Sequence, residues 1–132
     1  MKKVVYSLFV VLSCLACTSS EITSTVTLAV EIGPLCPVAN VNDVTPCGLS
    51  NTELNEIYSS YSAKVFSSSD NSKLFYNAAL TYPAKIQVTL PFDQYTIEVS
   101  NAGKAITVNP NSFSVNSTNT GVITINVDTG IR

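Results

Sequence analysis

The four cysteines are the residues of this sequence whose type and spacing are best suited to chemistry. Cys14 and Cys17 lie at the end of an apolar N-terminal run, and Cys36 and Cys47 lie in a proline-rich segment with ten residues between them. A cysteine that ends a secretory signal can be acylated, whereas two distant cysteines in an oxidising compartment form a disulfide. Metal or redox chemistry at Cys36 and Cys47 is disfavoured, because the pair lacks the CxxC spacing and the chain contains no histidine.

The N-terminal segment has the pattern of a secretory signal. Lys2 and Lys3 form a short positive region, and residues 4–16 (VVYSLFVVLSCLA) form a largely apolar run of 13 residues. This run is well short of the roughly 20 residues that a helix needs to span a bilayer. We therefore expect residues 1–16 to be a signal peptide and the protein to be exported to the periplasm or the cell surface.

Two cysteines compete as the site of lipidation, since each follows a small residue as lipoprotein signals require. Lipidation of Cys17 discards Cys14 with the signal and leaves Cys36 and Cys47 as a disulfide pair. Lipidation of Cys14 instead leaves Cys17 as an odd thiol in an oxidising compartment, which is unusual. We therefore predict a lipid on Cys17, with Cys14 as the alternative and ordinary cleavage after about Ser20 as a further one.

The mature chain is small and weakly charged. Removal of residues 1–16 leaves 116 residues, enough for one domain, and the loss of Lys2 and Lys3 takes the formal net charge from −2 to −4. Residues 17–24 are small and polar and predict a flexible tether, followed by a domain over residues 25–132. No basic cluster remains, which argues against a nucleic-acid partner. The expected partners are the membrane, through the lipid, and a protein or glycan.

The sequence offers little for catalysis. The absence of histidine removes the usual general base and the commonest metal ligand. Glu53 and Glu56 are the only carboxylates close enough in sequence to suggest a pair, and their spacing is typical of a solvated helix face. Asn40, Asn42 and Asp43 offer oxygens to calcium, but turn chemistry explains them without an ion. We therefore predict no catalytic residue, no metal and no cofactor.

The body of the chain alternates between apolar and polar residues, which is typical of strands with one buried face. About seven segments have this character: residues 25–32, 61–66, 74–80, 84–90, 95–99, 106–108 and 123–127. Turn-rich segments separate them at residues 67–72, 91–94 and 109–112. This pattern predicts an all-β fold, a Greek-key β-sandwich of about seven strands with one disulfide loop.

A single helix is expected, over residues 50–58. Ser50 or Asn51 can cap it, and Glu53 follows Ser50 by three residues as in a capping box.

The aromatic residues predict two further features. Tyr95 follows a turn, so its ring can pack while its hydroxyl reaches a nearby carbonyl, as corner tyrosines do in sandwiches; ordinary strand packing is the alternative. Several aromatic residues lie partly outside clean alternation and predict a contact patch: Tyr58, Tyr61, Tyr76, Tyr82 and Phe92.

Four short motifs follow one another in a familiar order: GPLCPV at 33–38, PCG at 46–48, LPFDQYTIEV at 90–99 and DTGIR at 128–132. On these residues the chain resembles small secreted proteins with a prealbumin-like, carboxypeptidase-regulatory-type domain. The resemblance implies a seven-stranded transthyretin-like or Ig-like fold and an accessory or binding module without catalytic residues. The chain departs from the family at Gln94, where a turn glycine is usual, and in a longer connection over residues 49–61.

These observations predict a non-catalytic exported lipoprotein, a binding or structural module at the surface or in the periplasm. The alternative is a small extracytoplasmic carbohydrate-active or inhibitor protein.

Overall fold

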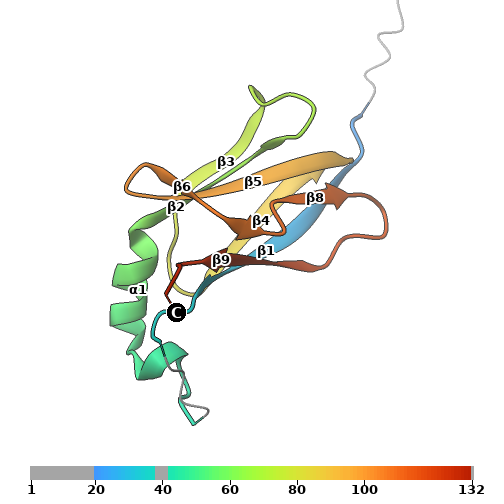
Figure 1. Cartoon of the computed structure of the whole chain (residues 1–132). Helices are drawn as coiled ribbons and strands as arrows, with labels where there is room; N and C mark the ends of the chain where they lie inside the picture. Colours follow the sequence, from blue (N-terminus) through green and yellow to red (C-terminus); the bar gives the residue numbers. More distant parts are fainter. Residues whose placement is uncertain (1–19, 38–41, 132) are drawn as a thin grey trace, which may run out of the picture.

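The alternating segments of the sequence form two β-sheets that enclose one apolar core (Figure 1). The computed structural model describes residues 20–37 and 42–131. The signal peptide predicted over residues 1–16, the two candidate lipidation sites Cys14 and Cys17, and Asn40 lie outside these residues. In the described part of the chain, no helix has the length and apolar character needed to cross a membrane.

The first sheet has the strand order β4-β1-β9-β7. Its strands are β1 (Thr23–Gly33), β4 (Ala84–Pro91), β7 (Val108–Asn109) and β9 (Val122–Asp128). β1 pairs antiparallel with β4 and parallel with β9. β1 begins two residues before the predicted start of the domain at residue 25, because Thr23 and Ser24 pair with Pro91 and Leu90.

The second sheet has the order β3-β2-β5-β6, with β8 also paired to β5. Its strands are β2 (Tyr61–Ser67), β3 (Leu74–Ala79), β5 (Asp93–Asn101), β6 (Lys104–Ile106) and β8 (Ser112–Val115). All of its pairings are antiparallel. The predicted hairpin loop at residues 67–72 joins β2 to β3, as expected.

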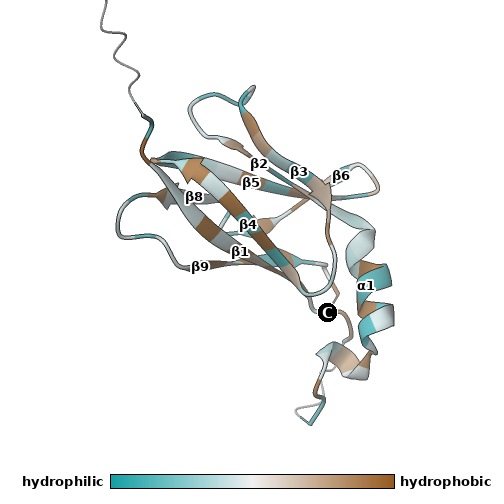
Figure 2. Ribbon diagram, turned by 180° about the vertical axis from the view of Figure 1, so that it is seen from behind, coloured by the Kyte–Doolittle hydropathy of each residue, from teal (hydrophilic) through white to brown (hydrophobic). Residues whose placement is uncertain are grey.

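The core is built from the apolar face of each alternating strand, and Figure 2 shows the alternation along β4. On β1, residues Val26, Leu28, Val30 and Ile32 are buried while their neighbours are more exposed. The all-β sandwich with one disulfide that the sequence predicted is therefore confirmed. Apolar-polar alternation determines which face of a sheet a residue lies on, but not which strands become neighbours. The sequence therefore did not predict the parallel pairing of β1 with β9.

The segment around Ile106 differs from the prediction of one short strand. The chain changes sheets there, since β6 ends at Ile106 in the second sheet and β7 begins at Val108 in the first. β8 was not predicted either, although Phe113 and Val115 are buried and alternate with serines. Residues 20–37 and 42–131 thus form nine strands, of which β6 and β7 are only three and two residues long.

A short helix, α1 (Asn51–Ser59), joins the two sheets at one end of the sandwich (Figure 1). The predicted capping box is present: the Ser50 hydroxyl accepts from the Glu53 amide, and the Glu53 carboxylate accepts from the Ser50 amide at 2.8 Å. The Ser50 hydroxyl also donates to the Glu53 carboxylate at 2.7 Å, and this bond, together with the one from the Ser50 amide, holds the pKa of Glu53 below its usual value. Leu54 and Tyr58 form the buried face of the helix.

The N-terminal end of the described chain and the helix lie at opposite ends of the sandwich (Figure 1). β1 runs the whole distance between these two ends, from Thr23 to Gly33, which lies beside the disulfide loop.

Tyr95 anchors the other end of the core as the sequence predicted. Its side chain is 1% exposed, and its hydroxyl donates to the Pro91 carbonyl at 2.8 Å. The ring packs edge-on against Phe75 and stacks on Phe113, with ring centroids 5.3 and 5.7 Å away. Burial raises the pKa of the Tyr95 hydroxyl, so it remains a neutral donor.

We predict that Tyr95→Phe lowers the free energy of unfolding by about 1–2 kcal/mol, because the buried ring is kept while the bond to Pro91 is lost. Urea denaturation measures this change. Ser68→Ala, which removes an exposed hydroxyl contact to Thr96, is the control and should change stability by less than about 0.5 kcal/mol. Equal stability of Tyr95→Phe and the wild type would contradict a structural role for this bond.

Candidate functional site

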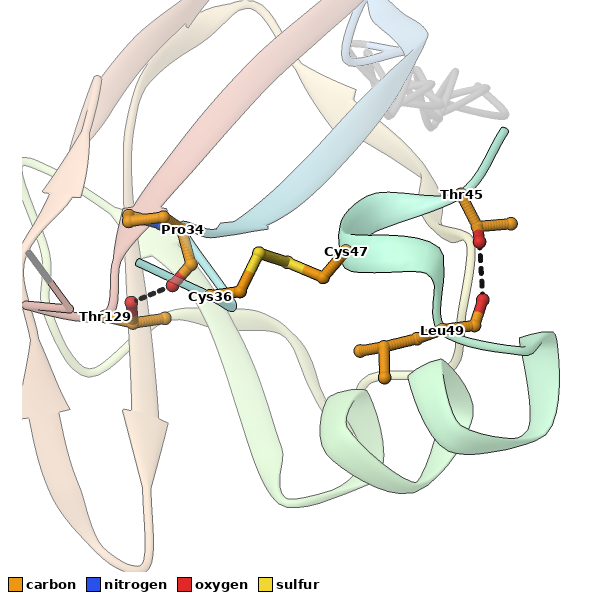
Figure 3. Close-up of a disulfide and its surroundings, with 6 residues drawn as sticks. All are labelled: Pro34, Cys36, Thr45, Cys47, Leu49 and Thr129. Carbon is orange, nitrogen blue, oxygen red and sulfur yellow. Dashed lines mark hydrogen bonds between the residues drawn. A yellow bond between two sulfur atoms is a disulfide. The ribbon is translucent and has the colours of Figure 1, made fainter. Parts of the chain in front are cut away.

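The disulfide predicted between Cys36 and Cys47 is present, with an S–S distance of 2.04 Å (Figure 3). It joins the segment that leaves β1 to a short 3-10 helix, Pro46–Gly48, which precedes α1. Cys47 and Gly48 both have positive φ angles, 58° and 67°, so the chain reverses tightly at the bridge. The Thr45 hydroxyl donates to the Leu49 carbonyl at 2.5 Å and closes this turn.

The C-terminal segment holds the other side of the same loop (Figure 3). The Thr129 amide donates to the Gly33 carbonyl at 3.2 Å, and the Thr129 hydroxyl donates to the Pro34 carbonyl. The Asp128 carboxylate accepts from the Gly130 amide at 2.8 Å and shapes this last turn. Two segments that are far apart in sequence, residues 33–34 and residues 128–130, are therefore held together at one end of the sandwich.

A concave surface of about 500 Å³ opens at this end, and we call it the end groove. It exists because the two ladders of β1 have different lengths: the ladder with β9 continues to Gly33, but the ladder with β4 stops at Val30. The space beyond Ala84, the first residue of β4, is left open. The lining comes from all the elements that meet here: Ala29, Val30, Glu31, Ile32, Gly33, Pro46, Tyr58, Tyr82, Pro83, Ala84, Lys85, Asn126 and Val127.

Two tyrosines form an aromatic wall of the end groove. The rings of Tyr58 and Tyr82 meet edge to face with centroids 5.2 Å apart. Tyr82 is held in place by its amide, which donates to the Asn55 side chain on α1 at 3.1 Å. Tyr58 is 4% exposed, whereas Tyr82 is half-buried.

The Tyr58 hydroxyl also accepts a hydrogen bond from the backbone amide of Ile32, at 3.1 Å. This β1 amide lies beyond the end of the β4 ladder, and the tyrosine satisfies it in place of a strand. Burial raises the pKa of the Tyr58 hydroxyl, and the bond from Ile32 acts in the opposite direction. The helix is thereby fixed to β1 at the back of the groove.

Three polar side chains line the outer side of the groove: one carboxylate, one ammonium group and one neutral amide. Glu31, Lys85 and Asn126 are exposed and belong to three neighbouring strands of the first sheet. Glu31 lies directly across from Asn126 in the parallel ladder, and Lys85 lies opposite Ala29 in the antiparallel one. The groove therefore combines hydrogen-bond donors, acceptors and a partly open aromatic ring with no excess of either charge.

A second groove of about 410 Å³ adjoins the first. The two share Gly33, Asn126 and Val127 in their linings, and the second continues over Pro34 and β7 to Asp128. A ligand longer than the end groove therefore has an adjacent concave surface along which to extend.

The structure brings together only part of the predicted aromatic patch. Tyr58 and Tyr82 meet in the end groove, whereas Tyr61 is buried in the core, Tyr76 lies on β3 and Phe92 lies at the opposite end beside Ile22. The groove itself was missed, since Glu31, Lys85 and Asn126 come from segments far apart in sequence. Their exposure on alternating strands was the only signal, and it does not identify which strands are neighbours.

The two glutamates that the sequence suggested as a pair lie on the solvent-exposed surface of the helix. Glu53 and Glu56 lie on the exposed face of α1, as expected. Among the described residues, no group of three or more histidine, cysteine, aspartate or glutamate side chains is arranged to hold a metal ion.

Comparison of the chain with protein-family models, with curated proteins and with solved structures gives no match.

We predict that the double substitution Cys36→Ser, Cys47→Ser lowers the free energy of unfolding by about 2–3 kcal/mol, because the bridge closes a loop of about a dozen residues in the unfolded chain. Chemical denaturation measures the change, and the wild type unfolded with reducing agent should match the double variant. Unchanged stability in both samples would show that the bridge does not constrain the protein.

Proposed function

We propose that this protein is a non-catalytic, exported binding module, tethered by a lipid at Cys17, that binds a neutral glycan in the end groove. The observation that carries the proposal is the end groove itself, where a partly exposed tyrosine faces a rim with one carboxylate, one ammonium and one amide.

The chemistry of the rim favours a neutral, polyhydroxylated ligand. Glu31 accepts hydrogen bonds, Lys85 donates them and Asn126 does both, so each can engage sugar hydroxyls. Their charges balance, and an anionic or cationic ligand would gain little net attraction. The half-buried Tyr82, which lines the groove, can offer the face of its ring to the C–H face of a sugar. The adjoining second groove favours an oligomer over a monosaccharide.

The positions of the two ends support the tethered arrangement. The chain enters the sandwich at the end opposite the groove, so a lipid on Cys17 would leave the groove facing away from the membrane (Figure 1). Two exposed apolar side chains, Ile22 at 68% and Phe92 at 40%, are adjacent at the tethered end, where the Phe92 amide donates to the Ile22 carbonyl. They suit an end that lies near a lipid surface.

The alternative, a small carbohydrate-active enzyme, requires two carboxylates that converge on the substrate. Glu31 and Asp128 line adjoining grooves, but Asp128 accepts from the Gly130 amide as part of the C-terminal turn. We therefore favour binding without hydrolysis.

Titration of the ¹⁵N-labelled protein with cellohexaose, xylohexaose, chitohexaose and maltohexaose tests the proposal. We expect amide shifts at the end groove with at least one of them, and an affinity at least tenfold lower, about 1.4 kcal/mol, for Tyr82→Ala. Gln87→Ala, on the same sheet but outside the groove lining, is the matched control and should bind like the wild type.

Shifts with none of the sugars, or equal loss of binding in Tyr82→Ala and Gln87→Ala, would contradict the glycan proposal. Cleavage of a sugar during the titration would favour the enzyme.

A further inference from the structure

Ile22 and Phe92 are adjacent exposed apolar residues at the end of the sandwich where β1 begins, and we call them the apolar corner. Their side chains are 68% and 40% exposed. The Phe92 amide donates to the Ile22 carbonyl at 3.1 Å, one step beyond the pairing of Thr23 with Pro91. Neither residue belongs to the apolar core. The two are therefore held next to each other while both remain open to solvent.

The backbone of the apolar corner is fixed on both sides. β4 ends at Pro91 in the first sheet and β5 begins at Asp93 in the second, so Phe92 is the single residue between them. The Tyr95 hydroxyl donates to the Pro91 carbonyl at 2.8 Å, directly before the corner. A side chain on a fixed backbone loses little conformational entropy when it binds.

The length of the tether limits what can cover the apolar corner. Ile22 follows Cys17 by five residues, which span at most about 18 Å when fully extended. If Cys17 carries the proposed lipid, the corner therefore stays within this distance of the bilayer. A folded domain of 100 residues has a radius of gyration of about 13 Å, so it is too wide to lie between the corner and the membrane. The lipid surface itself fits this space.

The charges beside the apolar corner indicate the class of lipid. Glu21 and Asp93 are exposed and flank the corner, one next to each apolar residue. Burial is the main cause of the raised pKa of Tyr95, and repulsion from Asp93 and Glu21 adds to it, so both carboxylates lie near that hydroxyl. The hairpin loop between β2 and β3 adds one charge of each sign, Asp70 and Lys73. Anionic lipids would be repelled, whereas zwitterionic headgroups offer ammonium groups to the carboxylates.

We propose that the apolar corner inserts into the headgroup region of a zwitterionic bilayer and holds the sandwich with the end groove pointing away from the membrane. A lipid on Cys17 alone would leave the domain free to rotate, and the corner supplies a second point of contact. The short tether keeps the corner at a high local concentration near the bilayer, so a weak insertion is sufficient. The inference rests on the proposed lipid at Cys17 but not on the proposed glycan.

Fluorescence quenching tests the insertion, since the chain contains no tryptophan and a single one can report on its surroundings. The full chain with Phe92→Trp is purified from its exporting cells, its intact mass is measured, and it is reconstituted into phosphatidylcholine vesicles with brominated acyl chains. We expect at least about twofold quenching, because groups inserted at the interface lie about 5–10 Å deep, near the bromine atoms.

Val44→Trp is the matched control reporter. Val44 is fully exposed in the disulfide loop, at the opposite end of the sandwich. Its tryptophan should lose less than about a tenth of its fluorescence, because it lies beyond the interfacial layer. Ile22→Trp, at the other residue of the apolar corner, is a second reporter and should be quenched like Phe92→Trp.

A serine substitution separates insertion from the presence of the lipid anchor. Ile22→Ser in the Phe92→Trp chain should remove at least about half of the quenching, since part of the inserted apolar surface is lost. Val122→Ser is its control, because Val122 is 66% exposed but lies opposite Thr27, four residues or about 13 Å along β1 from Thr23. This control should leave the quenching unchanged.

Each remaining outcome would overturn the proposal in a distinct way. Unquenched corner tryptophans in a chain of lipidated mass would contradict insertion alone, whereas a mass without lipid would contradict the anchor as well. Equal quenching of Phe92→Trp and Val44→Trp would mean that the sandwich lies flat on the bilayer. Blue-shifted emission without quenching would mean that another protein covers the corner. Stronger quenching after phosphatidylglycerol replaces the unbrominated lipid would contradict the zwitterionic preference.

Discussion

The pairing of β1 on both sides is the constraint on which the rest of the structure depends. It joins β4 and β9 into one sheet and buries four alternating apolar residues, from Val26 to Ile32, against the second sheet. It also links the two ends of the sandwich, since it begins where the described chain enters the sandwich and ends beside the disulfide loop. The end groove follows directly, because β9 accompanies β1 to Gly33 while β4 begins only opposite Val30.

β4 is too short to pair with the last residues of β1, and the elements around the groove make contacts with β1 in its place. Tyr58 accepts the Ile32 amide that a longer strand would have paired, and Cys36–Cys47 holds Pro46 at the rim. Thr129 fixes Gly33 and Pro34 from the C-terminal side. The described residues of two motifs that carry the family resemblance, GPLCPV and DTGIR, thus have a structural explanation in this chain, because Thr129 binds Gly33 and Pro34 at the end of β1.

The sequence predicted the features that depend on local residue patterns. It did not predict the features that depend on which strands become neighbours. Period two located the long strands, the capping box located α1, and the turn before Tyr95 predicted its hydroxyl bond. The parallel pairing of β1 with β9 and the change of sheet after Ile106 depend on which strands become neighbours, which alternation does not encode. The groove was unpredictable for the same reason, and Tyr58 was misplaced on a surface because its burial comes from α1 packing against β1.

We propose that this protein is exported with its disulfide-closed sandwich tethered at one end and open to a ligand at the other. Intact mass of the protein purified from the membranes of its own cells tests this most directly. We expect a chain that begins at Cys17 with a diacylglyceryl modification, and a deficit of two protons for Cys36–Cys47. An unmodified chain that begins near Glu21 with two free thiols would contradict it.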